Sequence, residues 1–274
     1  MKAYWTILVL FAFMANSVAT KAQGIPLGES ILVSTSPMKR DVDLEAFESF
    51  MLEELVSAWN KRSSGATMYL LKADRGGRKG ELLTVCIAAK PEDRKKLPSG
   101  SLFTDKAVVS VAGELSRRPS EFLSRPDGYT EYHLIGADQF TSLPAIDLLG
   151  IHYIKVKPDQ ARDFEKLVVQ KLHPAVGNLV NDMNLLYYKA VTGDDKGSYI
   201  TIYAIESVSA RERFWPTGGK EQDIVKQLFG PHKELALELS SYLVEDSYLG
   251  PETGAGAAYF ESKEWTDYVV LDSK

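Results

Sequence analysis

The sequence of 274 residues has few of the residue types that build cross-links and metal sites. It contains one cysteine, Cys86, and four histidines. A single cysteine excludes an intrachain disulfide and a zinc site built on several cysteines. Cys86 lies in an apolar segment, where we expect a small buried hydrophobic residue. No dinucleotide-binding, phosphate-loop, zinc-protease or serine-hydrolase motif occurs, and the sequence indicates no metal site.

An excess of positive charge is also missing. The chain has 32 lysines and arginines against 37 aspartates and glutamates, which gives a formal net charge of −5. This balance argues against a nucleic-acid partner, because such proteins carry basic surfaces that neutralise phosphates. The hydrophobic fraction of 45% and the charged fraction of 25% are typical of a folded globular chain.

Long apolar runs are absent after residue 22. Residues 1–22 have the pattern of a signal peptide, with Lys2, an apolar run over 4–15 and then small residues. The run is shorter than the roughly 20 residues of a transmembrane helix. We therefore expect cleavage after Ala19 or Ala22, export to a periplasm or to the medium, and no transmembrane segment in the mature chain. An uncleaved membrane anchor is the alternative.

The remaining sequence contains an internal repeat. Lys-Ala-Asp-Arg-Gly-Gly-Arg-Lys-Gly at 72–80 resembles Lys-Ala-Val-Thr-Gly-Asp-Asp-Lys-Gly at 189–197, an offset of 189 − 72 = 117. The same offset pairs Arg94 with Arg211. A constant offset over so many residues predicts a tandem duplication.

Near the ends of the two copies the offset widens to 136. It pairs Tyr-Thr-Glu-Tyr at 129–132 with Trp-Thr-Asp-Tyr at 265–268, so we expect an insertion in the second copy, over 250–258. The predicted organisation is a signal peptide over 1–22, a first repeat over 29–137, a linker over 138–147 and a second repeat over 148–274.

Each copy shows the order strand, helix, strand, strand, helix, strand. This βαββαβ order is that of the ferredoxin-like unit, an antiparallel sheet with helices on one face. The other sheet face needs cover, so we expect the two copies to pack sheet to sheet and close a barrel. The predicted strands are 31–36, 67–73, 81–88 and 129–135, then 149–156, 184–190, 198–205 and 265–271; the predicted helices are 43–59, 105–123, 159–172 and 221–243.

A tandem βαββαβ chain of this size resembles the dimeric α/β barrel superfamily in a fused two-copy form. The repeated pattern Lys-x-x-x-Gly-x-x-Lys-Gly between two strands, followed by an arginine and a proline, is similar to that of exported members. The resemblance implies an α+β fold of two ferredoxin-like repeats. The superfamily includes antibiotic-biosynthesis-type monooxygenases, NIPSNAP-like proteins and haem-handling members. Its implied activities are a cofactor-free monooxygenase or a haem-linked enzyme, with haem as the candidate cofactor.

The duplication helps to separate functional from structural residues. Residues kept in both copies, such as Tyr132, are expected to be structural, whereas no histidine repeats. We predict His152 and His173 as catalytic candidates, because histidine serves as a base near neutral pH and as a haem ligand. Tyr153 and His133 are candidate ligand-binding residues. A hydrogen-bonded core or helix-end imidazole is the alternative for each histidine.

The predicted strand and helix around these histidines lead to two further expectations. His152 and Tyr153 are neighbours in a predicted strand, so they face opposite sides of the sheet. One of them points into the barrel and the other points to the helix layer, and the sequence does not decide which. His173 precedes Pro174, where we expect the helix to end or bend.

Arg211, Arg213 and Trp215 form a second cluster of candidate binding residues. Arg211 and Trp215 are predicted to clamp an anionic or planar ligand. A structural role is the alternative, because Arg94 repeats the arginine.

The sequence favours binding of a small hydrophobic or planar ligand in a barrel cavity, without catalysis. The 13 tyrosines and four tryptophans support this hypothesis, because aromatic rings suit apolar ligands with a polar edge. The two enzyme activities implied by the resemblance and a non-catalytic protein-interaction module with a closed pocket are the alternatives. The basic turn at 72–79 is expected to be a solvated hairpin tip, and attraction of anions by its basic side chains is the alternative. Neither the ligand nor the oligomeric state follows from the sequence.

Overall fold

The computed structural model describes residues 25–88, 90–113, 118–125, 127–136, 145–176, 183–217, 230–244 and 265–271. The predicted signal peptide, most of the predicted linker and the predicted insertion lie outside these residues. None of the helices within the described ranges is long and apolar enough to cross a membrane.

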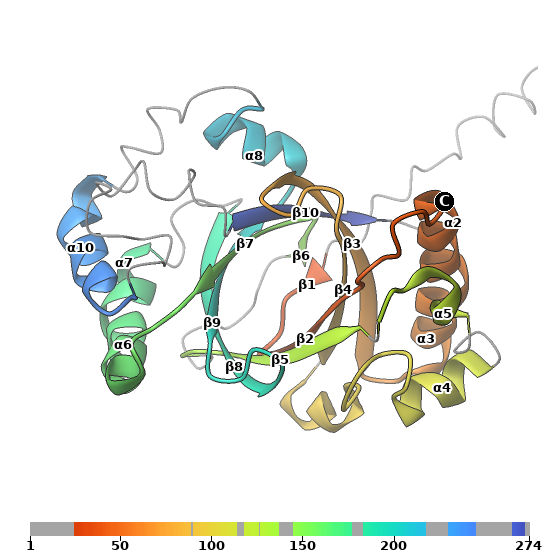
Figure 1. Ribbon diagram of the computed structural model, residues 1–274. Helices are drawn as coiled ribbons and strands as arrows, with labels where there is room; N and C mark the ends of the chain where they lie inside the picture. The colour runs from red at the N-terminus through yellow and green to blue at the C-terminus, as the bar shows by residue number, and fades with distance from the viewer. Residues whose placement is uncertain are drawn as a thin grey trace, which may run out of the picture.

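Antiparallel strands form a closed eight-stranded barrel in the order β10-β3-β4-β2-β5-β8-β9-β7 (Figure 1). Each strand corresponds to one that the sequence predicts. Their bounds are β2 Ser30–Thr35, β3 Ala66–Gly76, β4 Leu82–Ala88, β5 Gly128–Leu134, β7 Leu148–Ile154, β8 Met183–Gly193, β9 Tyr199–Ile205 and β10 Trp265–Leu271.

Strand order is the same in the two halves of the chain, β5-β2-β4-β3 in the first and β10-β7-β9-β8 in the second. The halves join at their edges, where β5 pairs with β8 and β10 pairs with β3. The predicted closure is therefore confirmed, but the halves share continuous hydrogen-bonded ladders as well as facing each other across the interior. Edge pairing removes the exposed strand edges that an open sheet would leave.

Alternation along the strands sends side chains to two buried layers. On β7, Leu149 and Ile151 belong to the cluster inside the barrel, whereas Leu148 and Ile154 belong to the cluster beneath the helices. Every residue of β4 and of β9 is buried, as expected for strands covered on both faces. Cys86 on β4 is buried in the outer layer, which confirms the predicted small core residue.

The first half is covered by a continuous helical stretch from Leu44 to Arg62. It begins at the N-cap residue Asp43, whose carboxylate accepts a hydrogen bond of 3.0 Å from the backbone N–H of Ala46. The helix predicted over 105–123 is divided, because α4 ends at Gly113 and a new helix begins at a proline. The elements are α2 Leu44–Ser49, π-helical η1 Phe50–Val56, α3 Ser57–Arg62, 3₁₀-helical η2 Pro91–Lys96, α4 Lys106–Ala112 and α5 Pro119–Phe122.

In the second half the first helix passes through Pro174 and continues to Val176. The expected end at this proline is corrected, because the helix continues past it and a π-helical segment precedes it. There the N–H of His173 donates to the carbonyl of Val168, five residues back. The elements are η5 Pro158–Gln160, α6 Ala161–Leu167, π-helical η6 Val168–Leu172, α7 His173–Val176, α8 Val208–Phe214, η7 Gly230–His232 and α10 Lys233–Ser241.

Helix α8 is not among the predicted helices, and it lies over β7 and β10 (Figure 1). Its N-cap is Ser207, whose hydroxyl accepts a hydrogen bond of 3.1 Å from the N–H of Ala210. The other helices of this half, α6, α7 and α10, lie on the opposite side of the barrel from α2 to α5 (Figure 1).

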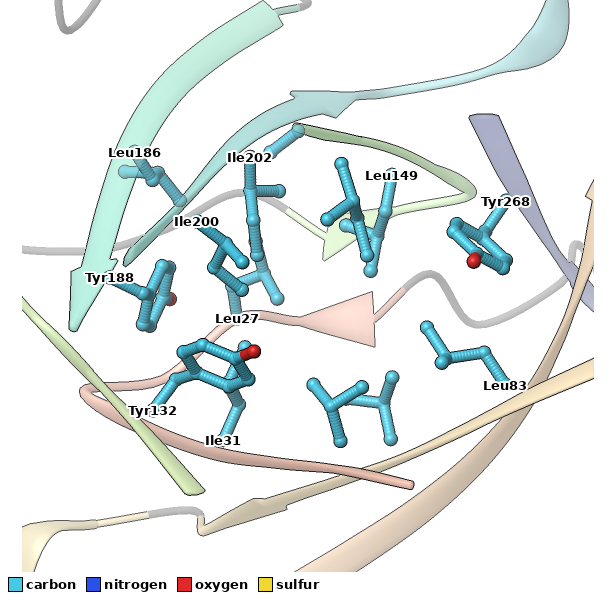
Figure 2. Packing of buried hydrophobic residues seen from close by; sticks show 14 of the residues in the cluster. Leu27, Ile31, Leu83, Tyr132, Leu149, Leu186, Tyr188, Ile200, Ile202 and Tyr268 are labelled. Atoms are coloured by element: carbon cyan, nitrogen blue, oxygen red, sulfur yellow. The ribbon is translucent and has the colours of Figure 1, made fainter. Parts of the chain in front are cut away.

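Apolar and tyrosine side chains from all eight strands fill the barrel interior (Figure 2). The short pair β1 (Ile25–Pro26) and β6 (Ala145–Ile146) lies at the end where β2 and β7 begin. Leu27 and Ile146 extend the interior cluster at that end. The hydroxyl of Tyr188 donates a hydrogen bond of 2.9 Å to the carbonyl of Gly28 and ties the N-terminal segment to β8.

A pair of glycine substitutions tests the packing of the β5–β8 seam. Gly193 and Gly197 have nearly the same φ, +91° and +90°, but an added Cβ at Gly193 would lie 2.7 Å from the Cα of Thr130 and would also clash with the carbonyl of Tyr129. Nothing lies within 4 Å of the same atom at Gly197. We expect Gly197→Ala to lower the free energy of unfolding by about 1–2 kcal/mol, and Gly193→Ala by a further ~1–3 kcal/mol. Chemical denaturation measures both, and equal losses would contradict the seam geometry.

Candidate functional site

A pocket of about 180 Å³ lies at the end of the barrel opposite β1 and β6. Thr35 at the end of β2 pairs with Gly128 at the start of β5, and both line the pocket. The pocket is smaller than the roughly 300–1,000 Å³ of drug-sized ligand sites, so it suits a small ligand. Its lining consists of Val33, Thr35, Arg78, Gly128, Tyr129, Thr130, Tyr132, Tyr153, Asp194 and Asp195.

Two buried tyrosines belong to the interior cluster of the barrel, and one of them, Tyr132, lines the pocket. Tyr132 on β5 and Tyr268 on β10 come from opposite sides of the barrel and point into its interior (Figure 2). Burial, with the neighbouring Tyr153 and Asp195, raises the pKa of Tyr132 well above its ordinary value. Burial, with Tyr153 and Glu81, raises the pKa of Tyr268 in the same direction. Both hydroxyls therefore stay protonated near neutral pH and act as hydrogen-bond donors.

The β8–β9 turn brings two carboxylates to the pocket. Asp195 Oδ2 accepts hydrogen bonds of 3.3 Å from the hydroxyl of Tyr132 and 3.3 Å from that of Thr130. The backbone N–H of Asp195 in turn donates to Thr130 Oγ1 at 3.2 Å. These contacts fix the orientation of Asp195.

Asp194 lies against Gly128, where an added Cβ would be 2.8 Å from Asp194 Oδ2 and 3.1 Å from Thr35 Oγ1. The glycine therefore leaves room for the Asp194 carboxylate at the pocket wall.

The β3–β4 turn supplies the cation of the pocket. The guanidinium of Arg78 lies 4.4 Å from the ring centroid of Tyr153, which is a cation–π contact between the two halves of the chain. Arg78 also forms an ion pair of 3.6 Å with Glu81, and Glu81 accepts a hydrogen bond of 3.1 Å from Tyr268. The turn expected to be a solvated hairpin tip thus contributes a pocket residue.

Of the predicted site residues, the structure places Tyr153 in the pocket lining. Its neighbour His152 points the other way, into the outer layer beneath α8. There the His152 ring lies 5.3 Å from the ring of Tyr203, which lies 5.7 Å from the ring of Trp215. Burial lowers the pKa of His152 to about 3, so the imidazole is neutral at neutral pH.

His173 does not line the pocket. It is buried at the start of α7, with its ring 5.9 Å from that of Tyr187 and close to Gly136. His152 and His173 are both packed among aromatic side chains, and neither lines the pocket described above. Haem as a cofactor therefore stays a prediction, which the described pocket does not support through either histidine.

Arg211 is almost completely buried and is held by three carboxylates. Its side chain contacts Asp74 at 2.6 Å, Glu212 at 2.7 Å and Asp267 at 3.4 Å. Asp267 also accepts a hydrogen bond of 2.6 Å from Arg75, so the cluster joins β3, β10 and α8 at the seam between the halves. In this geometry Arg211 and Trp215 are part of the packing beneath and beside α8.

The two remaining predicted residues lie near the surface. Arg213 is exposed on α8, with its guanidinium 5.8 Å from the ring centroid of Phe214. His133 is half-buried on the outer face of β5, where Nε2 lies 3.0 Å from Glu131 Oε1. Neither residue lines the pocket. The described residues contain no group of three or more histidine, cysteine or acidic side chains suited to holding a metal ion.

Sequence reasoning missed Asp194, Asp195 and Tyr132 as pocket residues, and it considered Arg78 only as part of a basic turn. At offset 117 Arg78 and Asp195 occupy equivalent positions of the repeated turn with opposite charge, and this difference was a usable signal. Tyr132 was set aside because it repeats as Tyr268.

The alignment of the first strands also needs a correction of one residue. Offset 117 pairs the outward-facing His152 with the pocket residue Thr35. The side chain of Tyr153 points into the barrel like that of Thr35, so Tyr153 is the structural equivalent of Thr35.

No protein-family model matches the sequence, and no curated protein matches it significantly. Solved structures do match. An anthrone oxidase-like protein has a TM-score of 0.51 at 10% identity, over 89% of this chain and 92% of that chain. A proposed monooxygenase from Fusobacterium nucleatum has a TM-score of 0.49 at 10% identity, over the same shares of the two chains. A proposed chlorite dismutase has a TM-score of 0.45 at 8% identity, over 90% of this chain and 96% of that chain. At such identities the likeness concerns the fold alone.

The burial of His152 predicts a pH dependence of stability. The unfolded chain binds a proton at His152 below about pH 6.5, whereas the folded chain does so only near pH 3. The free energy of unfolding therefore falls as the pH drops below about 6.5, by no more than ~1.4 kcal/mol per pH unit from this residue. We expect His152→Phe to reduce this slope between pH 6 and 4 in urea denaturation series. An unchanged slope would contradict a neutral buried imidazole.

Arg211 and Arg94 form a matched pair for testing the seam cluster. The Arg211 side chain is 3% exposed, and the Arg94 side chain, paired with Glu131 at 2.5 Å, is 46% exposed. Removing Arg211 takes away one of the two arginines that pair with the buried carboxylate of Asp267. Arg211→Leu should therefore lower the free energy of unfolding by about 3–5 kcal/mol. Arg94→Leu should lower it by about 1 kcal/mol or less. Denaturation of both variants measures the difference, and similar losses would argue against a structural role for Arg211.

Proposed function

We propose that this protein binds a small planar ligand with polar groups in the pocket at the end of the barrel. The observation that carries the proposal is a pocket of about 180 Å³ lined by aromatic, carboxylate and guanidinium side chains. Tyrosine rings supply flat apolar surface, and the charged groups supply orientation. The ligand expected from the sequence was hydrophobic or planar; the pocket supports the planar part and adds polar recognition.

The properties of the titratable groups favour binding over proton-transfer catalysis. The raised pKa of Tyr132 keeps its hydroxyl protonated, so it is a poor general base near pH 7. His152 is neutral, but it lies on the other face of the sheet from the pocket residue Tyr153. The monooxygenase and haem-linked enzyme alternatives therefore have less support than ligand binding. The interaction-module alternative assumed a closed pocket, and the pocket of about 180 Å³ supports it less. Membership of the NIPSNAP-like or antibiotic-biosynthesis-monooxygenase-like subfamilies stays a prediction.

We infer that the two halves arose by tandem duplication. Equal strand orders support this, and so do two ion pairs related by offset 117. Lys72 on β3 lies 2.5 Å from Glu48, and Lys189 on β8 lies 2.7 Å from Glu165. The signal-peptide pattern of residues 1–22 supports export, which would place the pocket outside the cytoplasm; a purified chain with the mass of all 274 residues would argue against cleavage.

Binding is tested by titrating the purified protein with three single-ring probes, benzamidinium, benzoate and benzyl alcohol. We expect at least one probe to shift the amide NMR signals of pocket residues in a saturable way. Gly128→Ala adds a methyl group against Asp194 and Thr35 without changing any charge, and should weaken that binding about tenfold or more. Gly100→Ala is the control, because nothing lies within 4 Å of its Cβ.

Two results would overturn the proposed function. One is a protein whose pocket signals respond to none of the three probes. The other is a Gly128→Ala variant that stays folded and binds as well as the wild type and Gly100→Ala. Neither residue has a positive φ, so alanine is compatible with the backbone at both positions.

A further inference from the structure

Within this pocket, we propose that the bound ligand is a small planar organic cation, such as an amidinium, a guanidinium or an aromatic ammonium ion. The inference rests on the proposed function, because it assigns a charge class to the ligand of the same pocket. It is carried by the arrangement of Asp194, Asp195, Arg78 and the tyrosine rings.

The first argument is the charge of the pocket. Two carboxylates and one guanidinium line it, and Glu81 lies 3.6 Å from that guanidinium. The formal charge of these four groups is −3 + 1 = −2. A concave site with an excess of one charge attracts ligands of the opposite sign.

The second argument is the hydrogen bonding of the carboxylates. Both hydrogen bonds to Asp195 end on Oδ2, and from the described residues its Oδ1 accepts none. Nor does the carboxylate of Asp194 accept a hydrogen bond within the described part of the chain. A fork of N–H donors on a planar cation matches such carboxylate oxygens.

The third argument is that the pocket already holds a planar cation of its own. The guanidinium of Arg78 stands 4.4 Å from the Tyr153 ring centroid and is balanced by Glu81. This contact shows that the aromatic wall accepts a flat, delocalised positive charge. Arg78 and Asp195 hold equivalent positions in the two turns, so the half with Asp195 lacks the built-in cation that the other half contains.

A purely structural role for the acidic turn explains fewer of these observations than ligand binding does. Hydrogen bonds from Thr130 and Tyr132 explain one oxygen of Asp195, but they do not explain the room that Gly128 leaves for Asp194. A ligand cation between the two carboxylates accounts for both features.

The test compares benzamidinium with benzoate by calorimetric titration of the purified protein. Benzamidinium should bind with saturation, and benzoate at least about tenfold more weakly. Asp195→Asn and Asp194→Asn should each weaken benzamidinium about tenfold, with the β8–β9 turn intact by NMR. Asp163→Asn is the matched control, because Asp163 is 61% exposed and pairs with Lys166 on α6; it should bind like the wild type.

Arg78→Gln separates the two charge classes further. If the ligand is a cation, this variant should bind benzamidinium as tightly as the wild type or more tightly, because a repelling charge is removed. Benzoate binding that exceeds benzamidinium binding and disappears in Arg78→Gln would overturn the cation and leave the binding pocket in place. Equal affinities of Asp195→Asn, Asp194→Asn and Asp163→Asn for benzamidinium would also overturn it. No response to any ring probe would instead remove the proposed function itself.

Discussion

The hydrogen-bonded seams β5–β8 and β10–β3 close the barrel, and the other features of the molecule depend on that closure. Without them each half would be a four-stranded sheet with two open edges and one uncovered apolar face. With them, every barrel strand has two neighbours and the interior face of each half covers that of the other. The buried cluster of Arg75, Arg211 and Asp267 lies at one seam, where a register shift interrupts the ladder between Asp267 and Tyr268.

Closure also determines where a ligand can bind. Apolar side chains fill the middle of the barrel, and Leu27 and Ile146 extend the packing at one end. Space remains at the opposite end, where the turns of both halves meet. The contact of Arg78 with Tyr153 joins a turn of the first half to a strand of the second, so the pocket requires both halves in place. The same constraint separates His152 from the pocket, because alternation on β7 directs it outward when Tyr153 faces inward.

The sequence predicted the strands well because their signals are local and strong. Runs of apolar and β-branched residues bounded by glycine turns located all eight barrel strands to within a few residues. Helix α8 was missed because seven residues carry little periodicity, and its stability comes from the buried contacts of Arg211 and Phe214. The π-helical segments were missed because no residue type marks them.

The candidate site was harder to predict than the fold. Tyr153 was predicted because it is next to His152 in the sequence. The histidines were predicted from the chemistry of imidazole, and the sequence does not show their surroundings. The pocket is formed by residues that are far apart in sequence, and Asp195 becomes part of it only through contacts with Thr130 and Tyr132 across the seam. Such a combination depends on barrel closure, which no local pattern encodes. The opposite charges of Arg78 and Asp195, at equivalent positions of the repeated turn, were a feature of the sequence that could have indicated the pocket.

Native-state hydrogen exchange tests the central claim, that the two halves form one closed and cooperative barrel. Amides in the β5–β8 and β10–β3 ladders are compared with amides in ladders within one half, such as β3–β4 and β8–β9. If the barrel opens as a unit, the slowest amides of all four ladders exchange with the same opening free energy, equal to that of global unfolding. Seam amides that exchange at a clearly lower opening free energy than those within each half would contradict the account.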